Sequence, residues 1–133
     1  MKQEKYLLDT CICIELIKCN PTVIEHIRRV GEDACVISSL TIGELYFGAY
    51  KSGRTKHFED VQTIESLFDQ YSITSCMKEY GEVRWQLERD GKMIDNMDLL
   101  IGATALHNDL ILVTDNVRHF ERIPGLMIEN WMV

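Results

Sequence analysis

The chain has no long apolar run and few prolines. Its apolar stretches fall well short of the ~20 residues that span a membrane, and the N-terminal MKQEKYLLD reaches an acid too early for a signal peptide. We therefore expect a cytoplasmic protein with no membrane partner. Only two prolines occur, and no repeat, low-complexity tract or Gly/Ser-rich linker divides the 133 residues. This length predicts a single domain, residues 1–133, around one buried core.

Paired cysteine spacing is also missing. The five cysteines are an odd number, which argues against a disulfide framework. The C-x-C of Cys11 and Cys13 has no second half that would complete a zinc site. We expect reduced thiols, with Cys13 in the core.

Positive charge is scarce, because 14 Lys and Arg stand against 21 Asp and Glu, a net charge of -7. This balance normally counts against a nucleic-acid partner, since phosphate binding is driven by Lys and Arg. Acids gathered at one place, however, repel one another unless a cation lies between them. The acidic balance therefore also fits a metal-dependent site.

Short apolar, β-branched runs alternate with stretches of helical periodicity along the chain. We expect strands at residues 5–9, 34–38, 72–74, 110–114 and 126–129. The last helical stretch, MDLLIGATALHN, is apolar nearly all round and should be buried. The alternation predicts an α/β fold with a central parallel sheet of about four to five strands flanked by helices.

Four acids fall where functional groups of a parallel sheet collect, near the carboxyl ends of strands. Asp9 and Asp115 each follow a predicted strand, Glu44 is expected in the first turn of the helix after ACVIS, and Asp98 opens the last helix. Oxygen ligands without a His pair suit Mg²⁺ or Mn²⁺ over zinc. Such an ion lowers the pKa of bound water and stabilises charge on a phosphoryl group, and a carboxylate that is not fully coordinated orients or deprotonates the water.

Each acid also has a purely structural explanation. Asp9 suits the cap of the next helix, and T-I-G-E ending at Glu44 matches a capping box. Asp98 suits a helix cap, as does its neighbour Asp95, and Asp115 suits a turn. For any single acid both explanations stay open, whereas four acids at one rim favour a site.

Three segments resemble the PIN-domain ribonucleases, specifically the VapC toxins of bacterial type II toxin-antitoxin modules. They are YLLDTCICIELIK, SSLTIGELYFGAYKS and DLLIGATALHNDLILVTDNVRHFERIPGLMIENW. The resemblance spans almost the whole chain and is weak only between about residues 52 and 78. It implies a PIN-like fold, Mg²⁺- or Mn²⁺-dependent endoribonuclease activity on an RNA such as a tRNA, a VapB-type antitoxin partner and a homodimer.

The family motif carries over onto the acids residue by residue. Its first three acids fall on Asp9, Glu44 and Asp98, which the resemblance makes catalytic and metal-binding. The fourth motif position falls on Asn116, with an extra acid, Asp115, beside it, so either residue is a candidate for the metal.

Three further polar residues match positions that help hold such a site. Thr114 and Asn116 occupy two of them, although a strand-end hydroxyl explains Thr114 equally well. Cys11 stands where the family usually has Asn, so a thiol, a weaker hydrogen-bond donor, replaces an amide. This departure keeps open a second function, a catalytically weakened PIN-fold module that binds RNA or a partner. A phospho-acceptor receiver domain is disfavoured, because the first strand ends in a single acid and LILVTDNVRHF has no Lys.

An RNA substrate needs positive charge near the acidic rim. The candidates are Arg28, Arg29, Lys51, Arg54, Lys56, His57, Arg118 and His119. For any single one of them, a solvated surface charge is the favoured explanation. The aromatic cluster Tyr46, Phe47 and Tyr50 exceeds what one helix face buries, which favours a partner helix or a second copy of the chain.

Overall fold

The computed structural model describes residues 3–133, in which strands and helices alternate. The strands are β1 (Tyr6–Leu8), β2 (Cys35–Ser38), β3 (Asp69–Tyr71), β4 (Ile111–Val113) and β5 (Ile128–Glu129). The α-helices are α1 (Thr10–Ile17), α2 (Pro21–Val30), α3 (Ser39–Ser52), α4 (Thr55–Leu67), α5 (Met77–Arg89), α6 (Asn96–His107) and α7 (Val117–Phe120). Two 3-10 turns, η1 (Glu32–Ala34) and η2 (Thr74–Cys76), precede β2 and α5.

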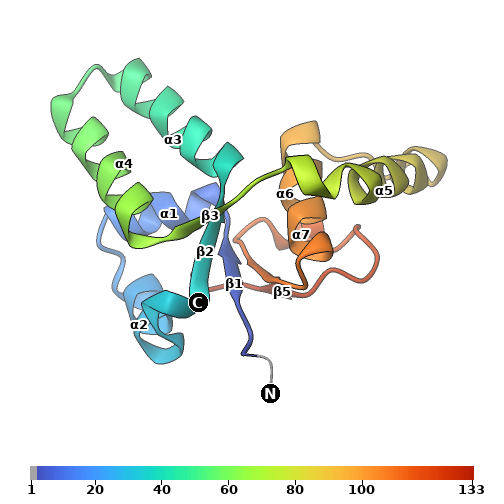
Figure 1. Cartoon of the computed structure of the whole chain (residues 1–133), viewed down its shortest axis with the longest axis horizontal. Helices are drawn as coiled ribbons and strands as arrows, with labels where there is room; N and C mark the ends of the chain where they lie inside the picture. The colour runs from blue at the N-terminus through green and yellow to red at the C-terminus, as the bar shows by residue number, and fades with distance from the viewer. Residues whose placement is uncertain (1–2) are drawn as a thin grey trace.

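The five strands form one parallel sheet in the order β3-β2-β1-β4-β5 (Figure 1). The expected α/β architecture with a central parallel sheet is therefore confirmed. β1 lies in the middle and pairs with β4 in a register that sets Leu8 opposite Val113. Because the strands are parallel, all their carboxyl ends meet at one edge of the sheet.

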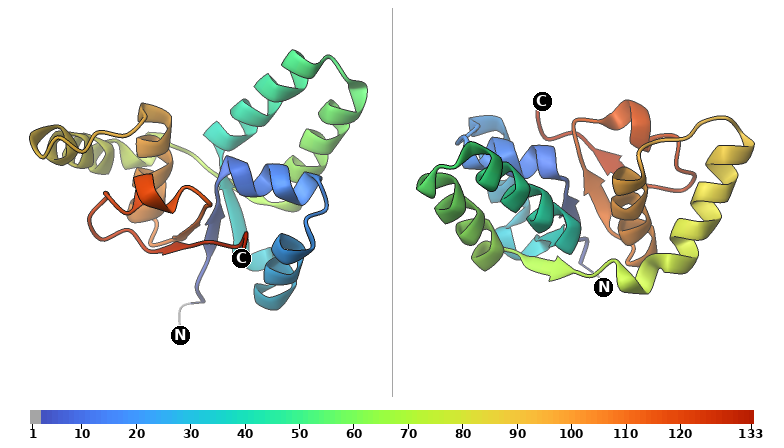
Figure 2. Two further views of the ribbon diagram at one scale, coloured as in Figure 1. Left: turned by 180° about the vertical axis from the view of Figure 1, so that it is seen from behind. Right: turned by 90° about the horizontal axis from the view of Figure 1, so that it is seen from above.

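Helices cover both faces of the sheet, which explains why its central strands read as continuous apolar runs. Along β1, Tyr6 and Leu8 face the cluster that contains the buried residues of α1, α2, α3 and α4. Leu7 faces the opposite cluster, with the buried residues of α5, α6 and α7. Figures 1 and 2 show the two groups of helices on either side of the sheet.

The expected third strand was placed wrongly. Residues 72–74 lie after β3, which is Asp69–Tyr71 at the edge of the sheet. Asp69 and Gln70 are exposed, so this strand is held mainly by backbone pairing to β2, and only its last residue, Tyr71, packs against the core.

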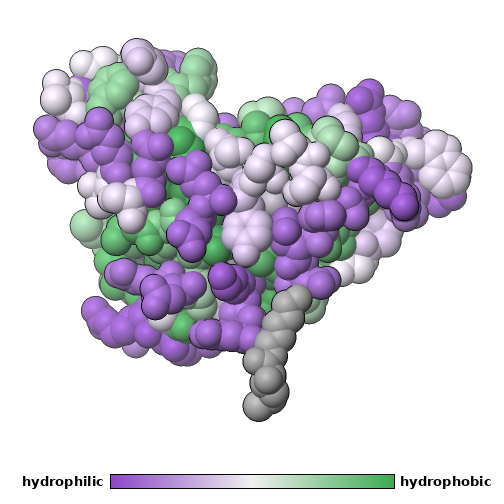
Figure 3. Space-filling view, viewed as in Figure 1, coloured by the Kyte–Doolittle hydropathy of each residue, from purple (hydrophilic) through white to green (hydrophobic). Residues whose placement is uncertain are grey.

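The surface shows where the apolar side chains remain accessible. Figure 3 shows apolar side chains between α4 and α2, where a hollow is lined in part by Leu16, Ile24, Ile27 and Phe68. The five cysteines are unpaired and Cys13 is fully buried, as expected. Between residues 3 and 133, no helix is long and apolar enough to cross a membrane.

Candidate active site

Asp9 is the buried centre of the acidic rim, only 6% exposed. Its backbone N–H donates to Val113 O at 2.9 Å, which continues the pairing of β1 with β4. Its Oδ2 accepts from Thr114 Oγ1 at 2.8 Å, and its Oδ1 accepts from the Thr10 N–H at 2.9 Å. Burial raises the pKa of the Asp9 carboxyl, and these hydrogen bonds oppose that rise. Asp9 therefore both caps α1 and presents a fixed carboxylate at the rim.

Glu44 reaches the same rim from α3. The expectation that Glu44 lies in the first turn was wrong, because α3 begins at Ser39 and Ser38 caps it by accepting from the Leu40 N–H at 3.1 Å. The capping-box explanation of Glu44 is overturned with it. Instead, Glu44 Oε1 accepts from Thr10 Oγ1 at 2.6 Å, so a hydrogen bond joins α3 to the start of α1.

Asp98 comes from the opposite side of the sheet, in the first turn of α6. The cap of this helix is Asp95, whose side chain accepts from the Met97 N–H at 3.2 Å, so the alternative that Asp98 caps it is wrong. Burial, followed by the negative charges of Asp9, Asp95 and Glu44, raises the pKa of Asp98 to about 6. These shifts indicate that three of the four predicted acids share one electrostatic environment.

Asp115 and Asn116 behave differently from the other predicted residues. Asp115 is exposed and its Oδ1 accepts from Asn130 Nδ2 at 3.1 Å. The Asn116 side chain lies 3.0 Å from His119 Nδ1, while its backbone N–H donates to Thr114 Oγ1 at 3.0 Å. Within the described residues, no hydrogen bond links either side chain to the other three acids. Asn116 thus supports the site through its backbone, by holding Thr114 against Asp9.

Cys11 contacts the site through a neutral thiol. Its Sγ lies 3.7 Å from Asp9 Oδ2 and 3.8 Å from Thr114 Oγ1. Burial, more than any nearby charge, raises the pKa of this thiol above its ordinary value. Cys11 is therefore a weak hydrogen-bond donor to Asp9, which is the role expected of the amide that it replaces.

The donor chemistry of this rim matches a hard cation, since Asp9, Glu44 and Asp98 offer only carboxylate oxygens. Over residues 3–133, however, no three His, Cys, Asp or Glu side chains are grouped as a metal site. Burial, and after it the negative charges of Asp9, Asp95 and Glu44, disfavours the charged form of Asp98, an electrostatic setting that a bound cation would relieve.

Sequence reasoning missed the hydroxyls that connect the acids. Thr10 Oγ1 bonds to Glu44 and also lies 3.2 Å from Thr41 Oγ1, which is fully buried. The available signal was a hydroxyl directly after Asp9 and another in the helix that carries Glu44.

Comparison of the sequence with known proteins identifies one family. A profile described as the PIN domain matches residues 6–126. Ribonuclease VapC2 of Haemophilus influenzae is 36% identical, over 96% of this chain and 98% of that protein. The tRNA(fMet)-specific endonuclease VapC of Shigella flexneri is 33% identical, with the same coverage of 96% and 98%.

Solved structures agree with these sequence matches. The VapBC2 complex of Rickettsia felis, bound to a DNA fragment from its promoter, contains a chain that superposes with a TM-score of 0.89. That chain is 33% identical, and the match covers 95% of this chain and 98% of that one. DNA-bound VapBC of Salmonella typhimurium gives a TM-score of 0.85 at 32% identity. The chain therefore belongs to the PIN domain family, among the VapC ribonucleases.

Proposed function

We propose that this protein is the endoribonuclease toxin of a VapBC module and hydrolyses phosphodiester bonds of RNA with the help of Mg²⁺ or Mn²⁺. The observation that carries the proposal is that Thr10 donates to both Asp9 and Glu44, while the charges of these two acids add to burial in raising the pKa of Asp98 to about 6. These three carboxylates come from separate elements, and within residues 3–133 none of them forms an ion pair with a Lys, Arg or His side chain. A hard divalent ion bound there supplies a water of lowered pKa and stabilises charge on the phosphoryl group.

The residues of the chain divide the work according to their contacts. Asp9 is held by hydrogen bonds to both of its oxygens and serves as a fixed ligand. Glu44 is oriented by Thr10. Asp98 has no hydrogen bond through its side chain to any described residue, so it is free to hold the ion or to take a proton from the attacking water. Asp115 stays a predicted fourth ligand at the edge of the rim.

The partners follow from the relatives. We propose a VapB-type antitoxin as the cognate partner and an RNA, such as a tRNA, as the cytoplasmic substrate. A hollow of about 460 Å³ between α1, α3 and α4 is lined by Glu44, by apolar side chains such as Ile14 and Leu45, and by the cations Lys18, Arg54 and Lys56. An antitoxin segment seated there would block the acidic rim. Phe47 and Tyr50, 68% and 75% exposed at the far end of α3, support a homodimer or a wider antitoxin contact.

The test is cleavage of RNA by purified protein as Mg²⁺ is varied. Asp9→Asn and Asp98→Asn should abolish cleavage and leave the circular dichroism spectrum unchanged, because each removes a ligand charge without removing volume. Undiminished cleavage by either variant would overturn the assignment. The second function, a PIN-fold binding module with weakened catalysis, is favoured by Cys11, and it predicts RNA binding without Mg²⁺-dependent cleavage by the natural sequence.

A further inference from the structure

A second charged feature lies beyond the carboxylates, on the side of α6 and α7. It is an open hollow lined by Gly91, Lys92, Arg118, Glu121 and Arg122. Three cations face one acid there, in a chain whose net charge is -7. We call it the basic hollow.

The basic hollow is built from the two segments that also carry site residues. One wall is the connection from α5 to α6, which leads directly into the turn that carries Asp98. The other wall is α7 with the residues after it, and α7 begins three residues beyond Thr114. The right panel of Figure 2 shows this connection passing beside α7. Both walls of the hollow therefore continue directly into segments that carry residues of the acidic rim.

The two walls are tied to each other. Arg122 Nη1 donates to the Met93 carbonyl oxygen at 3.1 Å, which joins the end of α7 to the connection. Gly91 turns the chain after α5 with a φ of +66°, a conformation that other residues rarely adopt. The hollow is thus formed before any ligand arrives, and Arg122 helps to build it.

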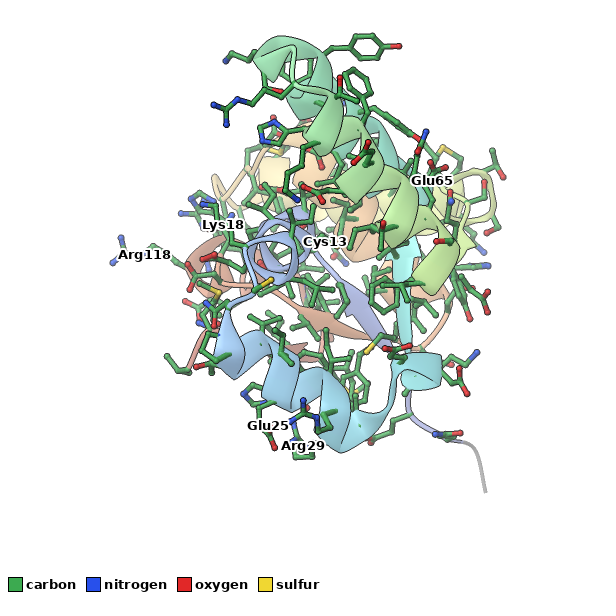
Figure 4. The ribbon with its side chains drawn as sticks, turned by 90° about the vertical axis from the view of Figure 1, so that its left-hand side faces the viewer. Cys13, Lys18, Glu25, Arg29, Glu65 and Arg118 are labelled. Carbon is green, nitrogen blue, oxygen red and sulfur yellow. The ribbon has the colours of Figure 1, made fainter. Side chains whose placement is uncertain are left out.

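The other two cations are available to a ligand. Arg118 is exposed and extends away from the body of the protein (Figure 4). No acid in the described part of the chain pairs with it. Lys92 is also exposed, and Asp90, the acid whose pKa it helps to lower, is already paired with Arg89 at 3.0 Å.

We propose that the basic hollow binds a backbone phosphate of the RNA substrate beside the bond that is cut, with Lys92 and Arg118 as its contacts. This inference rests on the proposed function and extends it to substrate positioning. A phosphate matches two unpaired cations. The lining contains no apolar side chain. A docked protein helix would need an apolar pocket in which to bury an anchoring side chain.

The experiment measures RNA affinity without catalysis. Fluorescein-labelled unfractionated tRNA is titrated with Asp98→Asn protein in EDTA, and the dissociation constant is followed by anisotropy between 50 and 200 mM KCl. Adding Lys92→Ala and Arg118→Ala should weaken binding about tenfold at low salt and reduce the slope of log Kd against log[KCl] by about 1–2, the loss of two phosphate contacts. The matched control is Lys78→Ala with Arg84→Ala, two exposed cations on the shaft of α5, which should change Kd less than about twofold.

A second arm separates this inference from the proposed function. In otherwise natural protein with Mg²⁺, the Lys92 and Arg118 substitutions should raise KM and leave kcat nearly unchanged, because these residues position the RNA without touching the reacting atoms. Unchanged tRNA affinity and KM, in protein whose cleavage still requires Asp98, would overturn the basic hollow alone. Loss of antitoxin binding with unchanged RNA affinity would also overturn the phosphate contact and would assign the hollow to an acidic protein segment.

Absence of RNA cleavage by every form of the protein, with the expected loss of RNA affinity, would overturn the proposed nuclease function and leave the phosphate contact in place.

Discussion

At the scale of single residues, structural and chemical roles coincide in some acids and separate in others. Asp9 caps α1 with one carboxylate oxygen and accepts from Thr114 with the other. In α6 the two roles are divided, because Asp95 caps the helix and Asp98 faces the rim. A substitution at Asp9 therefore alters a helix cap as well as the site, whereas one at Asp98 leaves the cap of α6 in place.

Glu44 gives the sharpest residue-scale prediction. Glu44→Gln should lower the rate of RNA cleavage by about 10–100-fold or more. Removing a group that only supports a metal ligand already costs about 10–100-fold in metal affinity or activity. The free energy of unfolding should change by less than about 0.5 kcal/mol, because Glu44 does not cap α3. Initial cleavage rates and urea unfolding measure the two quantities.

Ser38→Ala is the control for this prediction. It removes the real cap of α3, so it should cost about 1 kcal/mol of stability and leave cleavage largely intact. A Glu44→Gln protein that cleaves normally but unfolds more easily would reverse the two assignments.

At the scale of elements, the sequence predicts the central strands well because they are buried on both faces. The expected ranges 5–9, 34–38 and 110–114 contain β1, β2 and β4. The position of the edge strand β3 is not predicted from the sequence, because Asp69 and Gln70 are exposed and the strand is held mainly by backbone pairing to β2. The parallel sheet then predicts that the acids share a rim. The Thr10–Glu44 hydrogen bond and the basic hollow cannot be predicted from the sequence. Each joins segments that are far apart in the chain, and only packing determines how close they lie in space.

The packing of α6 gives a prediction at this scale. Gly102 lies where a Cβ would come within 2.5 Å of Ile123 Cδ1, and Ile123 is only 2% exposed. Gly102→Ala should therefore destabilise the protein by about 1–2 kcal/mol, since overpacking outweighs the gain in helix propensity. The melting temperature should fall by about 3–10 °C.

Gly81→Ala is the matched control, because Gly81 also lies within a helix but has open space at its Cβ position. It should stabilise α5 by up to about 1 kcal/mol. Equal melting temperatures for the two variants would show that α6 adjusts against Ile123 without cost.

At the scale of the whole molecule, the charge distribution reconciles a negative protein with a negative substrate. The net charge of -7 includes the acids gathered at the rim, while the basic hollow carries three cations beside them. The two clusters of buried residues on either face of one sheet suit the expected single domain, which stays a prediction. The proposed metal site should also make the stability of the fold depend on divalent ions.

Without a cation, the Asp98 carboxylate should destabilise the folded protein. Its pKa is raised to about 6, so the charged form is disfavoured in the fold, and at pH 7.5 this form predominates. After discounting for partial exposure we expect a cost of about 1 kcal/mol. Asp98→Asn should therefore raise the melting temperature in EDTA by about 3–5 °C.

Mg²⁺ should reverse this ranking. Free Mg²⁺ at ten times its dissociation constant stabilises the natural protein by about 1.4 kcal/mol through binding only the folded state. Its melting temperature should rise by about 4–7 °C, and that of Asp98→Asn should rise far less. Asp115→Asn in the same titration decides whether the fourth predicted acid contributes, because a ligand would lose the response and an exposed partner of Asn130 would keep it. A full Mg²⁺ response in Asp98→Asn would remove Asp98 from the metal site, since the ion would then be held without it.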